Sequence, residues 1–130
     1  MPTDPASLPI GIEHSFEEEV KFEYTIAFHD SRLPPVFSTP AMIGLMEVAA
    51  ARAVAPKLAP GEISVGTRIE VDHLKACMPG SRVRVWARLE SVERGRFLKF
   101  EVTAHCGELL IGRGHVFRAI VDTVRHGRSS

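Results

Sequence analysis

The chain has 130 residues, which suits one domain and is short for two. Apolar residues make up 45% and charged residues 25%, as in a folded globular domain. Lys and Arg total 16 and Asp and Glu total 16, and this net charge of zero argues against a general nucleic-acid-binding or membrane-surface protein.

Several further classes are excluded. No apolar run approaches the roughly 20 residues of a membrane helix, and residues 1–14 lack the basic and apolar regions of a signal peptide. The two cysteines, Cys77 and Cys106, lie outside any CxxC motif, so we expect no disulfide scaffold and a reducing cytoplasm. Together with His73 and His105 they are too few and too scattered for a zinc site, so we expect no metal.

The chain divides into three parts. Residues 1–15, rich in Pro, Ser and Gly, are predicted to form an N-terminal arm, residues 16–124 the folded domain, and residues 125–130 a flexible polar tail. Residues 1–62 hold 4 basic and 9 acidic side chains, a net charge of −5, and residues 63–130 hold 12 basic and 7 acidic ones, a net charge of +5. Such an asymmetry is compatible with an acidic ligand, a partner or no function at all.

In chain order, apolar side chains alternate with others from Val20 to Phe28, which predicts a strand with one buried face. The next segment, His29 to Phe37, contains two consecutive prolines and is predicted to be a loop. Thr39 and Pro40 then open a helix, with Thr39 as the N-cap.

This helix is predicted to run to about Ala55, where prolines and a glycine end it. Between Ala41 and Ala55 only Glu47 and Arg52 are charged, which indicates a helix buried almost all round.

The remainder has only strand patterns. Strands are predicted at Ile63–His73, Val83–Leu89, Phe97–Ala104 and Leu109–Val121, and the odd-numbered residues of the first are expected to share one apolar face. Gly112 and Gly114 indicate a bulge or a close approach of another backbone. One helix among antiparallel hairpins predicts an α+β fold, in which a single curved sheet wraps a buried helix.

Glu47 is the most informative residue. It has no basic residue three or four positions away on the helix, and a buried lone carboxylate is costly unless it is paired or hydrogen-bonded. This favours a base or nucleophile. The alternative is that Glu47 lies on a narrow solvated stripe of the helix.

His73 ends an apolar strand face, and Thr39 begins the helix, whose free N–H groups suit a developing oxyanion. Thr39, Glu47 and His73 are therefore expected to line one pocket. A structural histidine and a simple helix cap are the alternatives.

One face of the predicted strand at Val83–Leu89 carries Arg82, Arg84, Trp86 and Arg88. This face could be a platform for single-stranded nucleic acid or a solvated outer surface, and the net charge of zero favours the solvated surface.

The stretch from Val36 to Gly80 contains GLME, then APxLxPGExSxGT, then a His at the end of the next strand. This pattern resembles the hotdog-fold thioesterases of the fluoroacetyl-CoA thioesterase type, and the resemblance extends more weakly through GRGHVFRAIVD, Gly112 to Asp122. It implies a hotdog fold, usually paired into homodimers, that hydrolyses acyl-CoA without metal or cofactor.

The resemblance also implies site residues. Thr39, Glu47 and His73 match the family's catalytic residues, Gly66 matches a glycine of the acyl pocket, and Arg118 matches an arginine near that glycine. Glu47 would attack the carbonyl or activate water, His73 would pass a proton to the CoA sulfur, and Thr39 would orient the carboxylate or the substrate. Whether Glu47 or Thr39 is the nucleophile stays open.

One departure concerns the lid, which is rich in phenylalanine in the fluoroacetyl-specific member. Here the lid is SRLPPVF, with Leu33 in place and Phe37 retained, so we expect another short or medium acyl group. The basic residues near the pocket would hold the phosphates of CoA. The alternatives are a non-catalytic acyl-CoA or small-ligand binding module of the same fold and, ranked lower, a hydratase. We expect a homodimer, possibly a tetramer.

Overall fold

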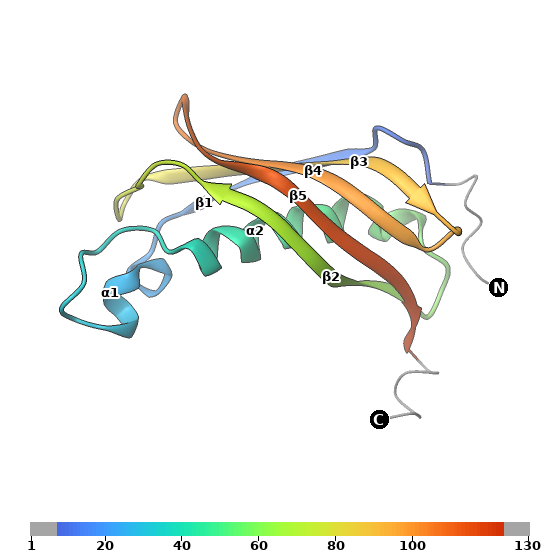
Figure 1. The fold of residues 1–130 in the computed structure, drawn as a ribbon, viewed down its shortest axis with the longest axis horizontal. Helices are drawn as coiled ribbons and strands as arrows, with labels where there is room; N and C mark the ends of the chain where they lie inside the picture. The colour runs from blue at the N-terminus through green and yellow to red at the C-terminus, as the bar shows by residue number, and fades with distance from the viewer. Residues whose placement is uncertain (1–7, 124–130) are drawn as a thin grey trace.

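The computed structural model describes residues 8–123, and within them one helix lies against a five-stranded antiparallel sheet. The elements are β1 (Glu13–Glu19), η2 (Phe22–Tyr24), α1 (Ile26–His29), α2 (Thr39–Val54), η3 (Ala55–Lys57), β2 (Glu62–His73), β3 (Arg82–Glu93), β4 (Phe97–Cys106) and β5 (Leu109–Asp122). The strand order is β1-β3-β4-β5-β2. The sheet curves over α2 (Figure 1), which confirms the predicted α+β architecture.

The N-terminal prediction was wrong. The first strand is β1, which begins within the segment predicted as an arm, and the predicted strand at Val20–Phe28 is replaced by the short helices η2 and α1. The alternation there does not bury one face, because Phe22 and Phe28 are 54% and 52% exposed. The predicted tail, residues 125–130, lies outside the described residues.

Helix α2 confirms the predicted helix but shifts its cap by one residue. Ser38 is the N-cap, and its hydroxyl accepts a hydrogen bond of 3.1 Å from the Ala41 amide. Thr39 is therefore the first helical residue and Pro40 the second. Since Ser38 caps the helix, the hydroxyl of Thr39 is available for another partner.

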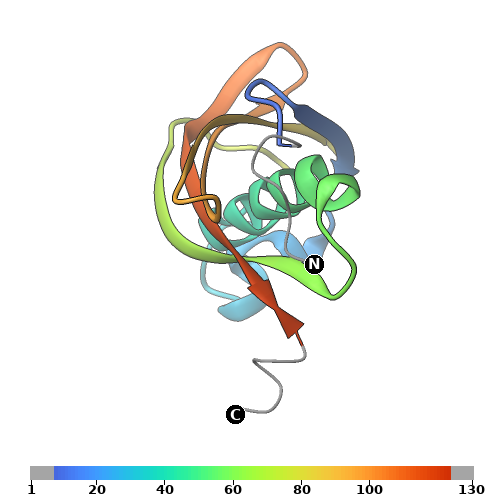
Figure 2. The same ribbon diagram turned by 90° about the vertical axis from the view of Figure 1, so that its right-hand side faces the viewer.

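The helix is buried on one side only. Met42, Met46, Ala49, Ala50, Ala53 and Val54 are buried against the sheet. Figure 2, which looks along the molecule, shows α2 cradled by the curved sheet. On the other side Gly44 and Val48 are exposed, so the prediction of a helix buried all round was wrong within this chain.

The four later strands are confirmed, and they exceed the predicted lengths by one residue in β2 and β5, two in β4 and five in β3. Strands β3 and β4 are joined by a turn in which Arg94 and Gly95 have φ of 53° and 70°. Two successive residues in the left-handed region are typical of the type I′ turns that match the twist of a hairpin.

Strand β2 contains a β-bulge that the sequence pattern did not reveal. Val65 pairs with Ala119 and Gly66 with Arg118, but Arg68 pairs with Phe117, so Thr67 is the additional residue. Residues paired across two strands point to the same face, and β5 alternates regularly from Gly112 to Ile120.

The bulge reverses the faces of β2. Position 112 of β5 lies against Met42 and Arg118 contacts Glu47, so the even-numbered residues of β5 face the helix. Ile69, Val71 and His73 are paired with this inner face, whereas Ile63 and Val65 are paired with the outer one. The expectation that all odd-numbered residues of β2 share one face was therefore wrong.

At Gly114 the expected close approach of another backbone is present. Its φ is 154°, and a Cβ there would overlap the carbonyl oxygen of Glu70 on β2. In the described part of the chain, no helix has the length and apolar character needed to cross a membrane.

Candidate active site

Thr39 and His73 meet where the start of α2 approaches the end of β2. The hydroxyl oxygen Oγ1 of Thr39 lies 2.8 Å from Nδ1 of His73, within hydrogen-bond distance. The shift of the helix cap to Ser38 makes this contact possible, because a capping Thr39 would direct its hydroxyl to the backbone of the first turn.

The two ring nitrogens of His73 differ in their contacts, since Nδ1 lies beside the Thr39 hydroxyl and Nε2 does not. Nε2 is buried and, among the described residues, has no hydrogen-bond partner. Burial lowers the pKa of His73, opposed by a backbone hydrogen bond at Lys75, so the ring favours its neutral form. The ring of Phe37 packs edge-on at 6.4 Å between centroids.

An open cleft of about 320 Å³ lies beside this pair. It is lined by Ile26, Val36, Phe37, Thr39, His73, Leu74, Lys75 and Ala76. The lining is mostly apolar apart from Thr39, His73 and the exposed Lys75. An apolar wall with a few convergent polar groups suits a small acyl ligand.

Glu47 occupies a second position, two helical turns further along α2. Its carboxylate lies against Gly66 so closely that a Cβ at position 66 would overlap Oε1 and lie 3.2 Å from Cδ. The bulge at Thr67 turns Gly66 toward the helix, and the absence of a side chain leaves room for the carboxylate.

Arg118 is the partner of Glu47. Its Nη1 lies 3.3 Å from Oε1 of Glu47, while its Nε donates to the Ser64 hydroxyl at 2.9 Å and its Nη2 to the Ser64 carbonyl at 2.7 Å. Burial lowers the pKa of Arg118, and the charge of Glu47 opposes that shift. The guanidinium is thus fixed by three contacts, and it fixes one oxygen of Glu47.

These residues form two groups rather than one. Thr39 and Glu47 are eight residues apart, which corresponds to about 12 Å along the helix axis. Glu47 is absent from the residues lining the cleft beside Thr39 and His73. Within one chain, the structure therefore joins Thr39 to His73 and Glu47 to Gly66 and Arg118.

The other sequence-predicted residues are placed as follows. Phe37 lines the cleft beside His73, whereas Leu33 is 43% exposed and does not line it. Arg82, Arg84, Trp86 and Arg88 alternate with buried residues on β3, as expected for a solvated outer face.

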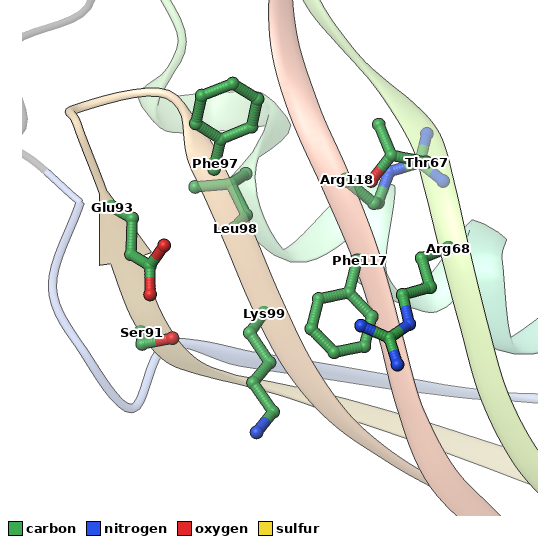
Figure 3. A pocket seen from close by; sticks show the side chains of 9 residues that line it. All are labelled: Thr67, Arg68, Ser91, Glu93, Phe97, Leu98, Lys99, Phe117 and Arg118. Carbon is green, nitrogen blue, oxygen red and sulfur yellow. The ribbon is translucent and has the colours of Figure 1, made fainter.

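A further cleft of about 390 Å³ is lined by residues of β2, β3, β4 and β5, among them Arg118 of the Glu47 group. Figure 3 shows Arg68 and Phe117 side by side there, with the guanidinium carbon of Arg68 5.3 Å from the ring centroid.

Sequence reasoning did not identify Ser64. It faces inward only because of the bulge, and its partner Arg118 is distant in sequence, so no local pattern marks it.

The model of the fluoroacetyl-CoA-specific thioesterase family matches residues 20–124. The fluoroacetyl-CoA thioesterase of Streptantibioticus cattleyicolor is 44% identical over 110 residues, which cover 85% of this chain and 73% of that protein.

Two solved structures are similar over nearly the whole chain. A variant of the fluoroacetyl-CoA thioesterase in complex with acetyl-CoA is 38% identical with a TM-score of 0.88, covering 93% of this chain and 95% of that one. A Thermus thermophilus protein of the thioesterase superfamily is 34% identical with a TM-score of 0.86, covering 94% and 90%. The chain therefore belongs to the fluoroacetyl-CoA thioesterase family and is a hotdog-fold thioester hydrolase.

Proposed function

We propose that the protein hydrolyses acyl-CoA thioesters to the free acid and CoA, using Thr39, Glu47 and His73. The observation that carries this proposal is the Glu47 carboxylate, held against Gly66 by Arg118. The similar enzyme bound to acetyl-CoA supports the same class of substrate. Free CoA thiol should appear from an acyl-CoA panel, and Glu47→Ala should abolish its release. Turnover that persists in this variant would contradict the proposal.

In this proposal Glu47 attacks the carbonyl carbon or deprotonates the water that attacks it. The bond from carbon to sulfur breaks, and the sulfur of CoA receives a proton from Nε2 of His73, which a proton of the water consumed in the reaction restores. Where Glu47 is the nucleophile, that water hydrolyses the acyl-Glu47 anhydride to the free acid and releases the carboxylate. Thr39 occupies Nδ1 and so directs proton transfer through Nε2, which has no partner among the described residues. Lys75, exposed at the rim of the cleft, suits the anionic CoA carrier.

We further propose that the acyl group is short or medium and that fluoroacetyl is not selected. The lid segment contributes Val36 and Phe37 to the cleft, while Leu33 is turned to solvent. Comparing kcat/KM for acetyl-, fluoroacetyl-, butyryl- and hexanoyl-CoA tests this. A preference of 100-fold or more for fluoroacetyl-CoA over acetyl-CoA, about 2.7 kcal/mol in transition-state binding, would contradict it.

The homodimer remains a proposal, and the exposed surface of the chain supports it. Gly44 and Val48 of α2 are exposed, and the edge strand β2 exposes 37% of Ile69 on its inner face. A position 44 side chain would meet nothing within 4 Å in this chain, so a second helix has room to approach there. A second copy would cover this apolar surface and pair the open edge of β2.

A two-fold dimer would also unite the two groups of the site. Thr39 and Glu47 each lie four residues from Ile43, on one stripe of α2. Where two antiparallel copies of the helix meet at Ile43, Thr39 of one protomer lies opposite Glu47 of the partner subunit. We propose that each site takes Thr39 and His73 from one protomer and Glu47 from the other.

The free thiols at Cys77 and Cys106 fit the expected cytoplasmic location.

Mixing two inactive variants tests the shared site. Glu47→Ala and His73→Ala homodimers, combined and allowed to exchange subunits, should regain about a quarter of the wild-type activity, because half of the dimers are mixed and each has one intact site. Variants carrying both substitutions in one chain, mixed with wild type, control for dilution. No recovery despite demonstrated subunit exchange, or a monomer by sedimentation, would contradict the shared site.

A further inference from the structure

The two cysteines of the chain lie in contact. Cys77 follows β2 in the loop toward β3, Cys106 ends β4, and they are 29 positions apart in sequence. The Cys77 thiol donates to the Cys106 sulfur, with the two sulfur atoms 2.7 Å apart. Both are free thiols. Neither takes part in the proposed reaction, so their juxtaposition requires a separate explanation.

We infer that Cys77 and Cys106 form a reversible disulfide when the protein meets a hydroperoxide, and that this bond fastens the loop behind His73. Disulfides of reducing compartments are typically transient and redox-sensing. The inference adds a modification site to the chain and does not depend on the identity of the acyl group.

The environments of the two thiols fix the order of the steps. Cys77 is 1% exposed, and burial, with Cys106 adding to the effect, raises its pKa to about 12. Cys106 is half-buried and lines an open surface cleft of about 550 Å³ together with Arg82 and Arg84. A hydroperoxide therefore reaches Cys106 first, while Cys77 is shielded behind it.

The chemistry balances with the hydroperoxide as oxidant. The Cys106 thiolate attacks the outer peroxide oxygen, the O–O bond breaks, and Cys106 becomes a sulfenic acid with release of an alcohol or water. The Cys77 sulfur then attacks the Cys106 sulfur, the S–O bond breaks, and a water molecule leaves with the Cys77 proton. The protein loses two hydrogen atoms in total.

The bond acts on the Thr39–His73 group through the backbone. Leu74, Lys75 and Ala76, which line the cleft, connect His73 to Cys77. The carbonyl of Cys77 accepts a hydrogen bond of 2.8 Å from the amide of Phe37, just before the N-cap of α2. A disulfide to β4 thus ties both segments that position Thr39 and His73 to the centre of the sheet.

The experiment uses the whole purified protein and hydrogen peroxide. We expect loss of both free thiols, a mass lower by two hydrogens, no covalent dimer on a non-reducing gel, and reversal by dithiothreitol. Closing this loop should raise Tm by about 10 °C. Cys77→Ser is the matched variant: peroxide should leave a Cys106 sulfenic acid that dimedone labels, with no rise in Tm. Cys106→Ser should react slowly, because its remaining thiol is buried.

Thiol content, mass and Tm do not depend on thioesterase activity, so these measurements keep this inference separate from the proposed function. Retention of both thiols in excess peroxide, covalent dimers, or a sulfinic acid at Cys106 with Cys77 still free would each overturn it. The consequence for the site rests on the proposed function: after heating between the two Tm values, the oxidised protein should keep its thioesterase activity and the reduced protein should lose it. Equal losses would refute the link to Thr39 and His73 even if the disulfide forms.

Discussion

Replacing Gly66 by alanine tests the arrangement of Glu47 most directly. The new methyl group would overlap Oε1 of Glu47, so the carboxylate must move by on the order of 1 Å to restore ordinary contact. Gly66 does not have positive φ, so alanine brings no backbone strain there. The substitution therefore acts through the carboxylate alone.

Two effects of Gly66→Ala on stability oppose one another. Displacing Glu47 weakens its bond to Arg118 and costs about 1 kcal/mol, at the low end for overpacking, because the side chain of Glu47 is 33% exposed and can rotate outward. Replacing glycine in an ordinary backbone conformation restores about 0.4–1 kcal/mol by restricting the unfolded chain. We expect Tm to change little.

Catalysis should respond much more strongly than stability. A displacement of this size in a reacting group costs roughly 100-fold in rate, or about 2.7 kcal/mol. The assay measures kcat for acyl-CoA hydrolysis beside Tm in a double-mutant cycle with Glu47→Ala. Once Glu47 is absent, the same alanine should stabilise the protein, giving a coupling of about 1 kcal/mol. Unchanged kcat in Gly66→Ala, or zero coupling, would refute the placement of Glu47 against Gly66.

Four further predictions concern other residues of the site and the sheet. Thr39→Val removes the hydroxyl at Nδ1 of His73 and should lower kcat about 100-fold, whereas Thr39→Ser should retain most of the activity. Equal activity of the two variants would contradict the role of the hydroxyl. Burial lowers the pKa of His73 from 6.5, so the stability contributed by the neutral ring should fall as the pH drops from 6.5 through the lowered pKa. Urea titrations of His73→Gln should not show this loss. Ser64→Ala removes the acceptor for Nε of Arg118 and should cost about 1 kcal/mol in urea unfolding and about tenfold in kcat, whereas unchanged kcat would show that Arg118 needs no such support. Gly114→Ala, whose methyl group would meet backbone rather than a movable side chain, should prevent stable folding, as judged by loss of a cooperative thermal transition.

The sequence predicted the elements whose signals are local and periodic. Helix α2 and the four later strands have strong patterns and clear turn residues, and Thr39 and His73 lie at their ends. The first strand was misplaced because β1, with Phe16 as its one large apolar residue, has little apolar alternation, and it forms through pairing with β3. The alternation of apolar residues at positions 20–28 is stronger, but this segment forms the short helices η2 and α1 and no strand of the sheet.

The part of the site that could not be predicted depends on long-range pairing. Ser64 and Arg118 are 54 positions apart, and their contact exists because β2 and β5 are neighbours in one register. The resemblance to the thioesterase family had already placed Arg118 near Gly66, and the structure makes the two residues direct partners across the strands. The bulge has no marker in the pattern, because Thr67 continues the alternation without interruption.

Because of the additional residue at Thr67, β2 can either form the proposed Glu47 group or bury Ile63 and Val65, but not both. Without it, Ile63 and Val65 would turn toward the helix, and Ser64 and Gly66 would turn to solvent. Such a protein would have a more apolar interior, yet it would lack both the support for Arg118 and the space for the Glu47 carboxylate. In this chain, which has the bulge, Ile63 and Val65 instead remain 47% and 37% exposed. Deletion of this single residue should thus keep the fold while removing the contacts on which the proposed role of Glu47 depends.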